Sequence, residues 1–397
     1  MIGTRLDNVD APRLVKSDQG WWFLGNRVWA LLRPEHVAED GTVRADVDEF
    51  LRENGAYRPR TPKSFSLTVL TSTSCNLGCG YCFQNTAPAP GGGHRPRRIG
   101  AEWLRGETID RIVEFTRGRM ELAGLEKLHL LLFGGEPLLN PRGCLELLER
   151  AQGIGLSGAT MVTNGVLLTE RLAVALHGAG LRGAQVTFDG SREDHDGIRV
   201  RHSGGATFDA IVDRVGRATA ATGLRWNLRV NVSHRTFDRI GELFPQLAGR
   251  VDPGRCSVTF AWVGDAGFGY GNALRHSDEV GDAFAQWAIT AIDAGFRVVR
   301  PGMKTACQIC AEPGGRCGAV VNADGTLYSC WQSAGKPGRE VGTIDTGYLD
   351  LDPAEVPERW VACGYEYAHA DPDDVMAGFQ DRVDGRVLDH LLAVGRM

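Results

Sequence analysis

Three cysteines, Cys75, Cys79 and Cys82, lie within eight residues in the segment SCNLGCGYCF (74–83). Soft thiolate ligands this close together are typical of a metal centre, yet tetrahedral zinc and ordinary iron–sulfur clusters take four protein ligands. A four-iron cluster held by three thiolates keeps one iron open, and a catalytic metal site needs an open position. The loop therefore predicts a reactive centre whose missing ligand is a substrate or cosubstrate. A zinc ion completed by His94 is the alternative.

The composition indicates an ordinary globular protein. The chain has 397 residues, of which 43% are hydrophobic and 23% are charged, and its net charge is −5. This balance gives no attraction to nucleic acid or to a membrane surface, and no apolar run approaches the ~20 residues of a membrane span. The N-terminus carries no secretory signal, so we expect a cytoplasmic protein, in which disulfides are rare.

The ten cysteines therefore favour metal binding over disulfides. Three lie at 75–82 and five at 307–363, while Cys144 and Cys256 stand alone. We interpret the two isolated cysteines as small buried apolar residues.

Strand–helix alternation extends over the middle of the chain. Apolar segments predict strands at 65–71, 128–133, 159–163, 184–188, 226–232 and 256–263. Near-continuous apolar strands joined by amphipathic helices indicate a parallel sheet. The predicted fold class is α/β, with a partial (β/α)6 TIM-like barrel, and a doubly wound sheet is the alternative. In both, the chemistry lies at the carboxyl ends of the strands, where the cysteine loop and the segment GGEP also fall.

The chain is predicted to have four parts. They are a small N-terminal α+β module at 1–60, the barrel at 61–285, a cysteine-rich C-terminal extension at 286–375 and a C-terminal helix at 376–397. In the first part, residues 20–32 suit a hairpin, and the aromatic run 21–23 forms either the core or a peptide-binding edge. Asp324-Gly325 predicts a hairpin turn in the extension. The Pro/Gly-rich loop 86–100, with Arg95, Arg97 and Arg98, is either a solvated loop or a lid beside the cysteines.

The spacing Cys-x3-Cys-x2-Cys, with Tyr81 before the last cysteine, resembles the signature of radical S-adenosylmethionine (SAM) enzymes. The resemblance implies that Cys75, Cys79 and Cys82 bind a 4Fe–4S cluster and that the amino and carboxylate groups of SAM chelate its open iron. It also implies reductive cleavage of SAM to a 5′-deoxyadenosyl radical, which takes a hydrogen atom from the substrate.

Further motifs extend this resemblance. FGGEP (133–137) is similar to the glycine-rich motif that holds the SAM amino group, where glycine permits close approach of the backbone. TNG (163–165) resembles a strand end that faces the ribose or the substrate. VTFDGSREDHDGIR (186–199) resembles a stretch of peptide-modifying members in which the arginine pairs with the SAM carboxylate. The implied cofactor-binding residues are Tyr81, Gly134, Gly135, Glu136, Asn164, Thr187 and Arg199.

Three residues of the last stretch differ from the motif or have two interpretations. Thr187 replaces the usual serine and keeps its hydroxyl. Asp189 and His195 are either part of the motif's function or turn and surface residues. No catalytic acid or base is assigned from the sequence.

The second cysteine group resembles a SPASM or twitch extension, which holds auxiliary four-iron clusters. A full SPASM domain has seven cysteines, so the five here imply one auxiliary 4Fe–4S cluster. Its ligands are drawn from Cys307, Cys310, Cys317, Cys330 and Cys363. A structural zinc site is the alternative.

The layout of a small module ahead of the first barrel strand resembles radical SAM enzymes that modify ribosomally made peptides. Some of these hold the leader peptide as an added strand. We therefore expect an oxidoreductase, a peptide maturase that installs a cross-link or other oxidative modification on a precursor peptide and takes electrons from a flavodoxin or ferredoxin. The alternatives are a sulfatase-maturase-like side-chain oxidase, a small-molecule radical SAM dehydrogenase and a non-catalytic iron–sulfur electron carrier.

Overall fold

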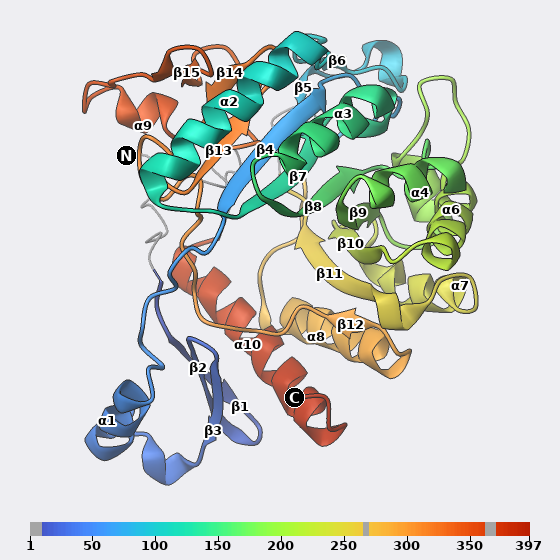
Figure 1. Ribbon diagram of the computed structural model, residues 1–397. Coiled ribbons are helices and arrows are strands. Elements are labelled where there is room, and N and C mark those ends of the chain that lie inside the picture. The colour runs from blue at the N-terminus through green and yellow to red at the C-terminus, as the bar shows by residue number, and fades with distance from the viewer. Residues whose placement is uncertain (1–9, 265–269, 362–370) are drawn as a thin grey trace. The chain divides into compact units, whose positions relative to one another are not determined.

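The computed structural model describes residues 10–264, 270–361 and 371–397 (Figure 1). It divides into two compact units. The terminal unit comprises Met1–Thr61, Leu274–Cys307 and His369–Met397, and the barrel unit comprises Pro62–Ala273 and Gln308–Ala368. This division differs from the boundaries expected after residues 60, 285 and 375. The segment from 274 and the C-terminal helix group with the N-terminal module, although they are distant from it in the sequence.

Six parallel strands form the centre of the barrel unit. They are β4 (Phe65–Ser72), β7 (Leu128–Gly134), β8 (Leu156–Thr163), β9 (Leu181–Phe188), β10 (Arg225–Val232) and β11 (Cys256–Trp262). Each strand pairs in parallel with the next one along the chain. The predicted α/β class with a partial (β/α)6 barrel is confirmed, because the strand order follows the chain without the reversal that defines a doubly wound sheet.

Helices follow these strands on the outer side of the sheet (Figure 1). They are α2 (Gly106–Ala123), α3 (Pro141–Gln152), α4 (Glu170–Gly178), α5 (Arg192–Ile198), α6 (Phe208–Ala221) and α7 (Leu243–Leu247). Helix α3 packs on β8 and α4 packs on β9. Cys144 on α3 and Cys256 on β11 are fully buried, so the interpretation of both as core residues is confirmed.

The C-terminal part of the barrel unit extends the same sheet. Strand β13 (Gly318–Val321) pairs in parallel with β4, and β14 (Thr326–Tyr328), β15 (Glu340–Thr343) and β16 (Gly347–Tyr348) follow as antiparallel strands. The helix α9 (Val356–Arg359) comes next. The predicted hairpin is confirmed, and its turn places Gly325 at φ 94°, a conformation that favours glycine. Loop 86–100 holds a small ribbon of β5 (Asn85–Ala87) and β6 (Arg97–Arg98).

The terminal unit is built on a three-stranded antiparallel sheet in the order β1 (Arg13–Ser17), β2 (Gly20–Gly25) and β3 (Val28–Leu32). Its other elements are α1 (Ala45–Glu53), α8 (Asp278–Asp293), β12 (Arg297–Val298) and α10 (Asp373–Ala393). Among the described residues, no helix of the chain combines the length and the apolar composition needed to cross a membrane.

Both faces of this small sheet are covered. Trp22 packs with Leu388 of α10, and Phe23 packs on the opposite face with Leu51 of α1. Trp22 and Phe23 are each 2% exposed on the central strand, so they are core residues and the edge interpretation is wrong for them. Since apolar side chains of α10 complete this core, the C-terminal helix belongs to the unit that the sequence analysis confined to residues 1–60.

Candidate functional site

The three-cysteine loop follows β4 at its carboxyl end. Cys75, Cys79 and Cys82 all line a cavity of about 600 Å³ inside the barrel unit, a size typical of small-molecule sites. Backbone hydrogen bonds hold the loop in place, since Gly78 N donates to Val200 O at 2.9 Å and His202 N donates to Asn76 O at 3.2 Å. The loop is therefore fixed between its first and its middle cysteine.

The glycines of GGEP allow the end of β7 to approach this loop. A Cβ on Gly134 would lie 2.1 Å from Ser72 O, and one on Gly135 would lie 2.4 Å from Ser74 O. Gly134 also has φ 141°, which side chains rarely adopt. The two glycines thus permit close approach to Ser72 and Ser74, and they form one wall of the cavity. Their predicted contact with the SAM amino group stays a prediction.

Glu136 lies behind that wall rather than on it. Its carboxylate is 0% exposed and accepts hydrogen bonds from Leu138 N (2.9 Å), Thr163 Oγ1 (2.7 Å) and Asn164 N (2.7 Å). Burial raises the pKa of Glu136, while these hydrogen bonds act to lower it. The carboxylate joins the ends of β7 and β8, and its predicted contact with SAM stays a prediction.

Asn164 is held by this carboxylate and faces the cysteine loop. Its Nδ2 donates to Asn76 Oδ1 at 2.8 Å and lies 3.8 Å from Cys75 Sγ. The side chain lines the cavity, and its expected contact with the ribose or the substrate stays a prediction.

Tyr81 is the centre of a polar cluster, which we call the Tyr81 cluster, with Asp189, Arg199 and Asn231. The tyrosine hydroxyl donates to Asp189 Oδ2 at 2.8 Å and accepts from Arg199 Nη1 at 2.8 Å and from Asn231 Nδ2 at 2.9 Å. Arg199 and Asp189 also form an ion pair at 3.6 Å. Asp189 is 1% exposed, so the surface interpretation of this residue is wrong.

The charges in the Tyr81 cluster depend on one another. Burial raises the pKa of Asp189, and the Arg199 charge opposes that rise. Burial alone would lower the pKa of Arg199, but the neighbouring Tyr81, Cys79 and Asp189 keep it above its usual value. The Nε of Arg199 is buried and has no hydrogen-bond partner among the described residues. This donor at the wall of the cavity suits an incoming carboxylate.

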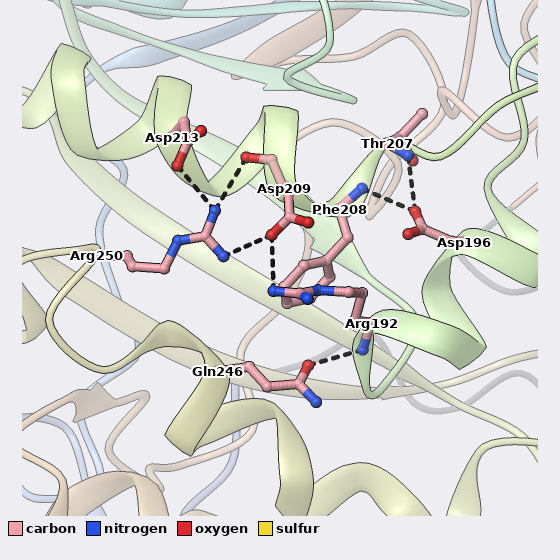
Figure 2. A network of polar contacts seen from close by, with 8 residues as sticks. All are labelled: Arg192, Asp196, Thr207, Phe208, Asp209, Asp213, Gln246 and Arg250. Atoms are coloured by element: carbon pink, nitrogen blue, oxygen red, sulfur yellow. Dashed lines mark hydrogen bonds and ion pairs between the residues drawn. The ribbon is translucent and has the colours of Figure 1, made fainter.

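Contacts on helices α5 and α6 fix the position of Arg199, and Figure 2 shows part of this network. Asp196 Oδ1 accepts from Thr207 N at 2.7 Å and from Phe208 N at 2.8 Å, which ties α5 to the start of α6. Arg192 pairs with Asp209 at 2.9 Å. Arg199 is the C-cap residue of α5, so contacts that hold this helix also hold Arg199.

His195 also helps to hold Arg199 in position, through Thr207. It is 0% exposed, which rules out the surface interpretation, and its Nε2 lies 3.0 Å from Thr207 Oγ1. That hydroxyl donates to Arg199 O at 2.8 Å, so the hydrogen between His195 and Thr207 must come from the imidazole. Burial keeps the pKa of His195 well below its usual value. The histidine is therefore a neutral positioning residue.

Arg98 is a residue of this site that the sequence reasoning did not single out from the three arginines of loop 86–100. Its Nη1 lies 3.3 Å from Cys82 Sγ, and its Nη2 donates to Gln84 Oε1 at 2.7 Å. A Cβ on Gly78 would lie 2.0 Å from His94 O, so the loop packs directly on the cysteine loop. The interpretation of this loop as a neighbour of the cysteines is confirmed, and a positive charge on it faces a predicted cluster ligand.

The structure also bears on the form of the metal centre. Among the described residues, no three His, Cys, Asp or Glu side chains are placed to ligate one metal ion. In a four-iron cluster each thiolate binds a different iron, so that arrangement does not require such a group. Burial raises the pKa of the Cys79 thiol to about 12, and a ligating thiol must be deprotonated. A cluster bound by Cys79 therefore requires this thiol to lose its proton as the metal binds.

Most of the predicted cofactor-binding residues come together. Apart from the three cysteines, the cavity is lined by Tyr81, Gly134, Gly135, Asn164, Thr187 and Arg199. The sequence analysis missed polar residues on the inner face of the sheet, Gln185, Asn227, Arg229 and Asn231. The alternation in RWNLRVNV (225–232) was the signal that could have identified the last three.

The second cysteine group is only partly described. Cys310 and Cys330 are buried, Cys307 and Cys317 are half-buried, and Cys363 lies outside the described residues. The auxiliary cluster therefore stays a prediction. Trp331, the neighbour of Cys330, contacts Phe133 with ring centroids 6.0 Å apart and lines the cavity, so the extension contributes to its wall.

The fold and the cysteine site define a radical SAM domain. Residues 69–244 match the model of the radical SAM superfamily, and this match establishes the domain in the chain. A domain of this family implies a 4Fe–4S cluster, SAM and catalytic activity. The residues present fit these groups, because three cysteines, two glycines and Arg199 line one cavity, and the Nε of Arg199 has no hydrogen-bond partner among the described residues.

Curated relatives carry one recurring name. The chain is 36% identical over 129 residues to a GTP 3',8-cyclase of Pelotomaculum thermopropionicum, a match that spans 32% of this chain and only 35% of that relative. It is 28% identical over 285 residues to a GTP 3',8-cyclase of Xanthomonas campestris pv. campestris, covering 68% of this chain and 79% of the relative.

Solved structures share the fold at low identity. Native anSMEcpe with bound AdoMet (S-adenosylmethionine) has a TM-score of 0.58 and 16% identity, with 83% of this chain and 98% of that chain covered. Streptococcus suis SuiB bound to S-adenosylmethionine has a TM-score of 0.50 and 14% identity, with 88% and 89% covered. At these identities the likeness shows the fold alone.

Proposed function

We propose that this chain is a radical SAM peptide maturase that oxidatively modifies or cross-links a precursor peptide. The observation that carries the proposal is the extent of one structural match. Native anSMEcpe has been solved with AdoMet and a Cp18Cys peptide, and this chain covers 98% of that structure with a TM-score of 0.57. The shared fold thus includes parts outside the radical SAM domain, which spans residues 69–244 here.

The chain's own residues have separate tasks in this proposal. Cys75, Cys79 and Cys82 hold the cluster, which with SAM supplies a 5′-deoxyadenosyl radical. Arg199 binds the SAM carboxylate through its unpartnered Nε, while the bond from its Nη1 to Tyr81 fixes the guanidinium plane. Asn164, which lines the cavity directly after β8, orients the nucleoside.

The remaining parts of the proposal concern electron transfer and recognition of the leader peptide. Four of the five C-terminal cysteines would hold one auxiliary 4Fe–4S cluster, which would supply an acceptor for the electron left after substrate oxidation, and a flavodoxin or ferredoxin would supply the electron for SAM cleavage. Residues 1–60 recognise the leader peptide. Strands β1 and β3 are the edges of their sheet among the described residues, and an edge strand can add a peptide through main-chain hydrogen bonds.

A second candidate is cyclisation of a nucleotide. The match to the Xanthomonas campestris pv. campestris GTP 3',8-cyclase covers 79% of that relative, and a cavity lined by arginines suits phosphate as well as carboxylate.

Anaerobic turnover decides between the two. Reconstituted enzyme, SAM and dithionite are incubated either with peptides encoded by short reading frames beside the gene or with GTP. The proposal expects 5′-deoxyadenosine formation coupled to loss of hydrogen mass from a peptide. A variant with Cys75, Cys79 and Cys82 all changed to Ala should lose SAM cleavage while it retains auxiliary iron. Conversion of GTP with no peptide product would refute the proposal.

A further inference from the structure

The cavity has an uneven charge balance. Its lining includes Arg98, Arg199, Arg225 and Arg229, and the described lining residues include no aspartate, glutamate, lysine or histidine. Cations that line a partly desolvated cavity favour anionic ligands there. A positive charge that has no counterpart in this lining therefore indicates where an anionic group of the ligand binds.

Two of the four arginines have identified counterparts. Arg98 faces Cys82 Sγ at 3.3 Å, where a cluster thiolate is predicted. Arg199 pairs with Asp189 and faces the proposed SAM carboxylate. Of the remaining two, Arg225 is exposed at the start of β10 and Arg229 lies half-buried in the middle of that strand.

Arg229 is held in place but not neutralised. Its Nε donates to Asn231 Oδ1 at 2.9 Å, and the described residues offer it no carboxylate within ion-pair distance. Since Nε is occupied, the two terminal nitrogens remain as a planar fork, the geometry that matches a carboxylate. Asn231 also donates to Tyr81, so the guanidinium is positioned by the same cluster that orients Arg199.

Near Arg229, the cavity-lining residues Gln185 and Asn227 form a polar floor, and Thr259 is hydrogen-bonded to Asn227. Asn227 Nδ2 donates to Gln185 Oε1 at 3.1 Å, and Thr259 Oγ1 donates to Asn227 Oδ1 at 2.9 Å. A barrel interior is usually filled by branched apolar side chains, so a polar interior beside a cavity indicates a place for a ligand. Arg229 pairs in register with Thr187, the predicted cofactor-side residue, which places the floor next to the SAM site.

We infer that Arg229 is the specificity-determining residue of a carboxylate subsite, which takes an Asp or Glu side chain of the peptide segment that undergoes modification. The inference rests on the proposed function, because it names a feature of that peptide substrate. The fork of Arg229 binds the carboxylate, the polar floor contacts the adjoining amide groups, and the bound segment lies beside the cofactor.

The test uses two blocked amino acids on the anaerobically reconstituted enzyme. N-acetyl-glutamate methylamide and N-acetyl-glutamine methylamide are titrated by calorimetry with saturating SAM and without reductant, so that the Arg199 site is filled and no turnover occurs. We expect the wild-type enzyme to bind the glutamate probe at least about tenfold more tightly than the glutamine probe. Arg229→Gln should abolish this preference, and Arg229→Lys should retain part of it.

Arg225→Gln is the matched control, since it removes the same charge from the same strand and the same cavity. It should retain the preference. The inference is overturned if the wild-type enzyme shows no preference, if the preference survives Arg229→Gln, or if Arg225→Gln removes it equally. Arg229-dependent binding of GTP that is tighter than binding of the glutamate probe would also overturn it, in favour of a nucleotide.

Two safeguards keep the result interpretable. Iron content and thermal unfolding show whether Arg229→Gln folds, and the two-probe comparison on the wild-type enzyme needs no variant. Failure of the proposed function looks different, because wild-type enzyme would then modify no peptide. Peptide modification without a glutamate preference would remove only the carboxylate subsite.

Discussion

Replacement of Arg199 by Gln separates cofactor binding from cluster binding. Arg199 is 8% exposed and Asp189 is 1% exposed, so both the ion pair and any carboxylate bound beside it are shielded from water. A hydrogen bond to a charged partner contributes about 1.5–3 kcal/mol, which corresponds to a dissociation constant for SAM that is about 10- to 150-fold larger in the variant. Iron content should not change, because Arg199 is not a predicted ligand.

The same substitution also affects stability. Removal of one partner from a buried ion pair costs about 3–5 kcal/mol. The loss should be near the lower limit, because Asp189, whose pKa is already raised by burial, can bind a proton once Arg199 is gone. The variant should therefore recover part of its stability as the pH falls towards the raised pKa of Asp189.

The measurements are calorimetric SAM titration of reconstituted enzyme, iron analysis and urea unfolding. Arg217→Gln is the matched control, since that arginine is exposed on α6 and is not among the contacts that fix the position of Arg199. Its SAM affinity should equal that of the wild-type enzyme. Native iron content with unchanged SAM affinity in Arg199→Gln would refute the assigned contact.

Three further predictions follow from the metal site and its supports. One cluster at each cysteine group gives about eight irons per chain by elemental analysis. About four irons and one zinc would instead indicate a structural zinc site in the second cysteine group. Gly135→Ala should displace the cysteine loop and destabilise the protein by about 1–3 kcal/mol, because the new Cβ would lie 2.4 Å from Ser74 O; Gly118→Ala, which meets nothing within 4 Å, should not. Because His195 is buried with a pKa well below the usual value, the unfolded chain binds a proton that the folded chain does not, so stability should fall as pH drops below about 6.5 and His195→Gln should flatten that slope.

The barrel could be predicted because its signals are local. Most of the six strands are rich in apolar residues, since burial on both faces of a parallel sheet leaves little room for polar ones, and β10 keeps its apolar residues at every second position. The cysteine loop was recognisable for a similar reason, because its three ligands lie within one short segment. Only the beginnings of β8 and β9 were placed three residues too late, where polar and small residues open the strands.

Features that depend on distant contacts could not be predicted. Nothing in the sequence of α10 indicates that Leu388 completes the core beneath Trp22, since the two residues are at opposite ends of the chain. Arg98 reads as one of three loop arginines until the fold places it against Cys82. Arg229 reads as a solvent-facing residue of an alternating strand, because periodicity gives its face but not whether that face meets water or a cavity.

The pairing of β13 with β4 has a consequence for biosynthesis. Ser66 N donates to Cys317 O at 2.9 Å, so one edge of the strand that leads into the cysteine loop is covered by a segment from the far end of the chain. On the ribosome, β4 emerges early and keeps this edge unpaired until nearly the whole barrel has been made. During that interval the nascent chain exposes an apolar strand edge of the kind that aggregates. Iron delivered before translation ends would meet a loop whose base is still incomplete, so we expect cluster insertion to be a late, post-translational step.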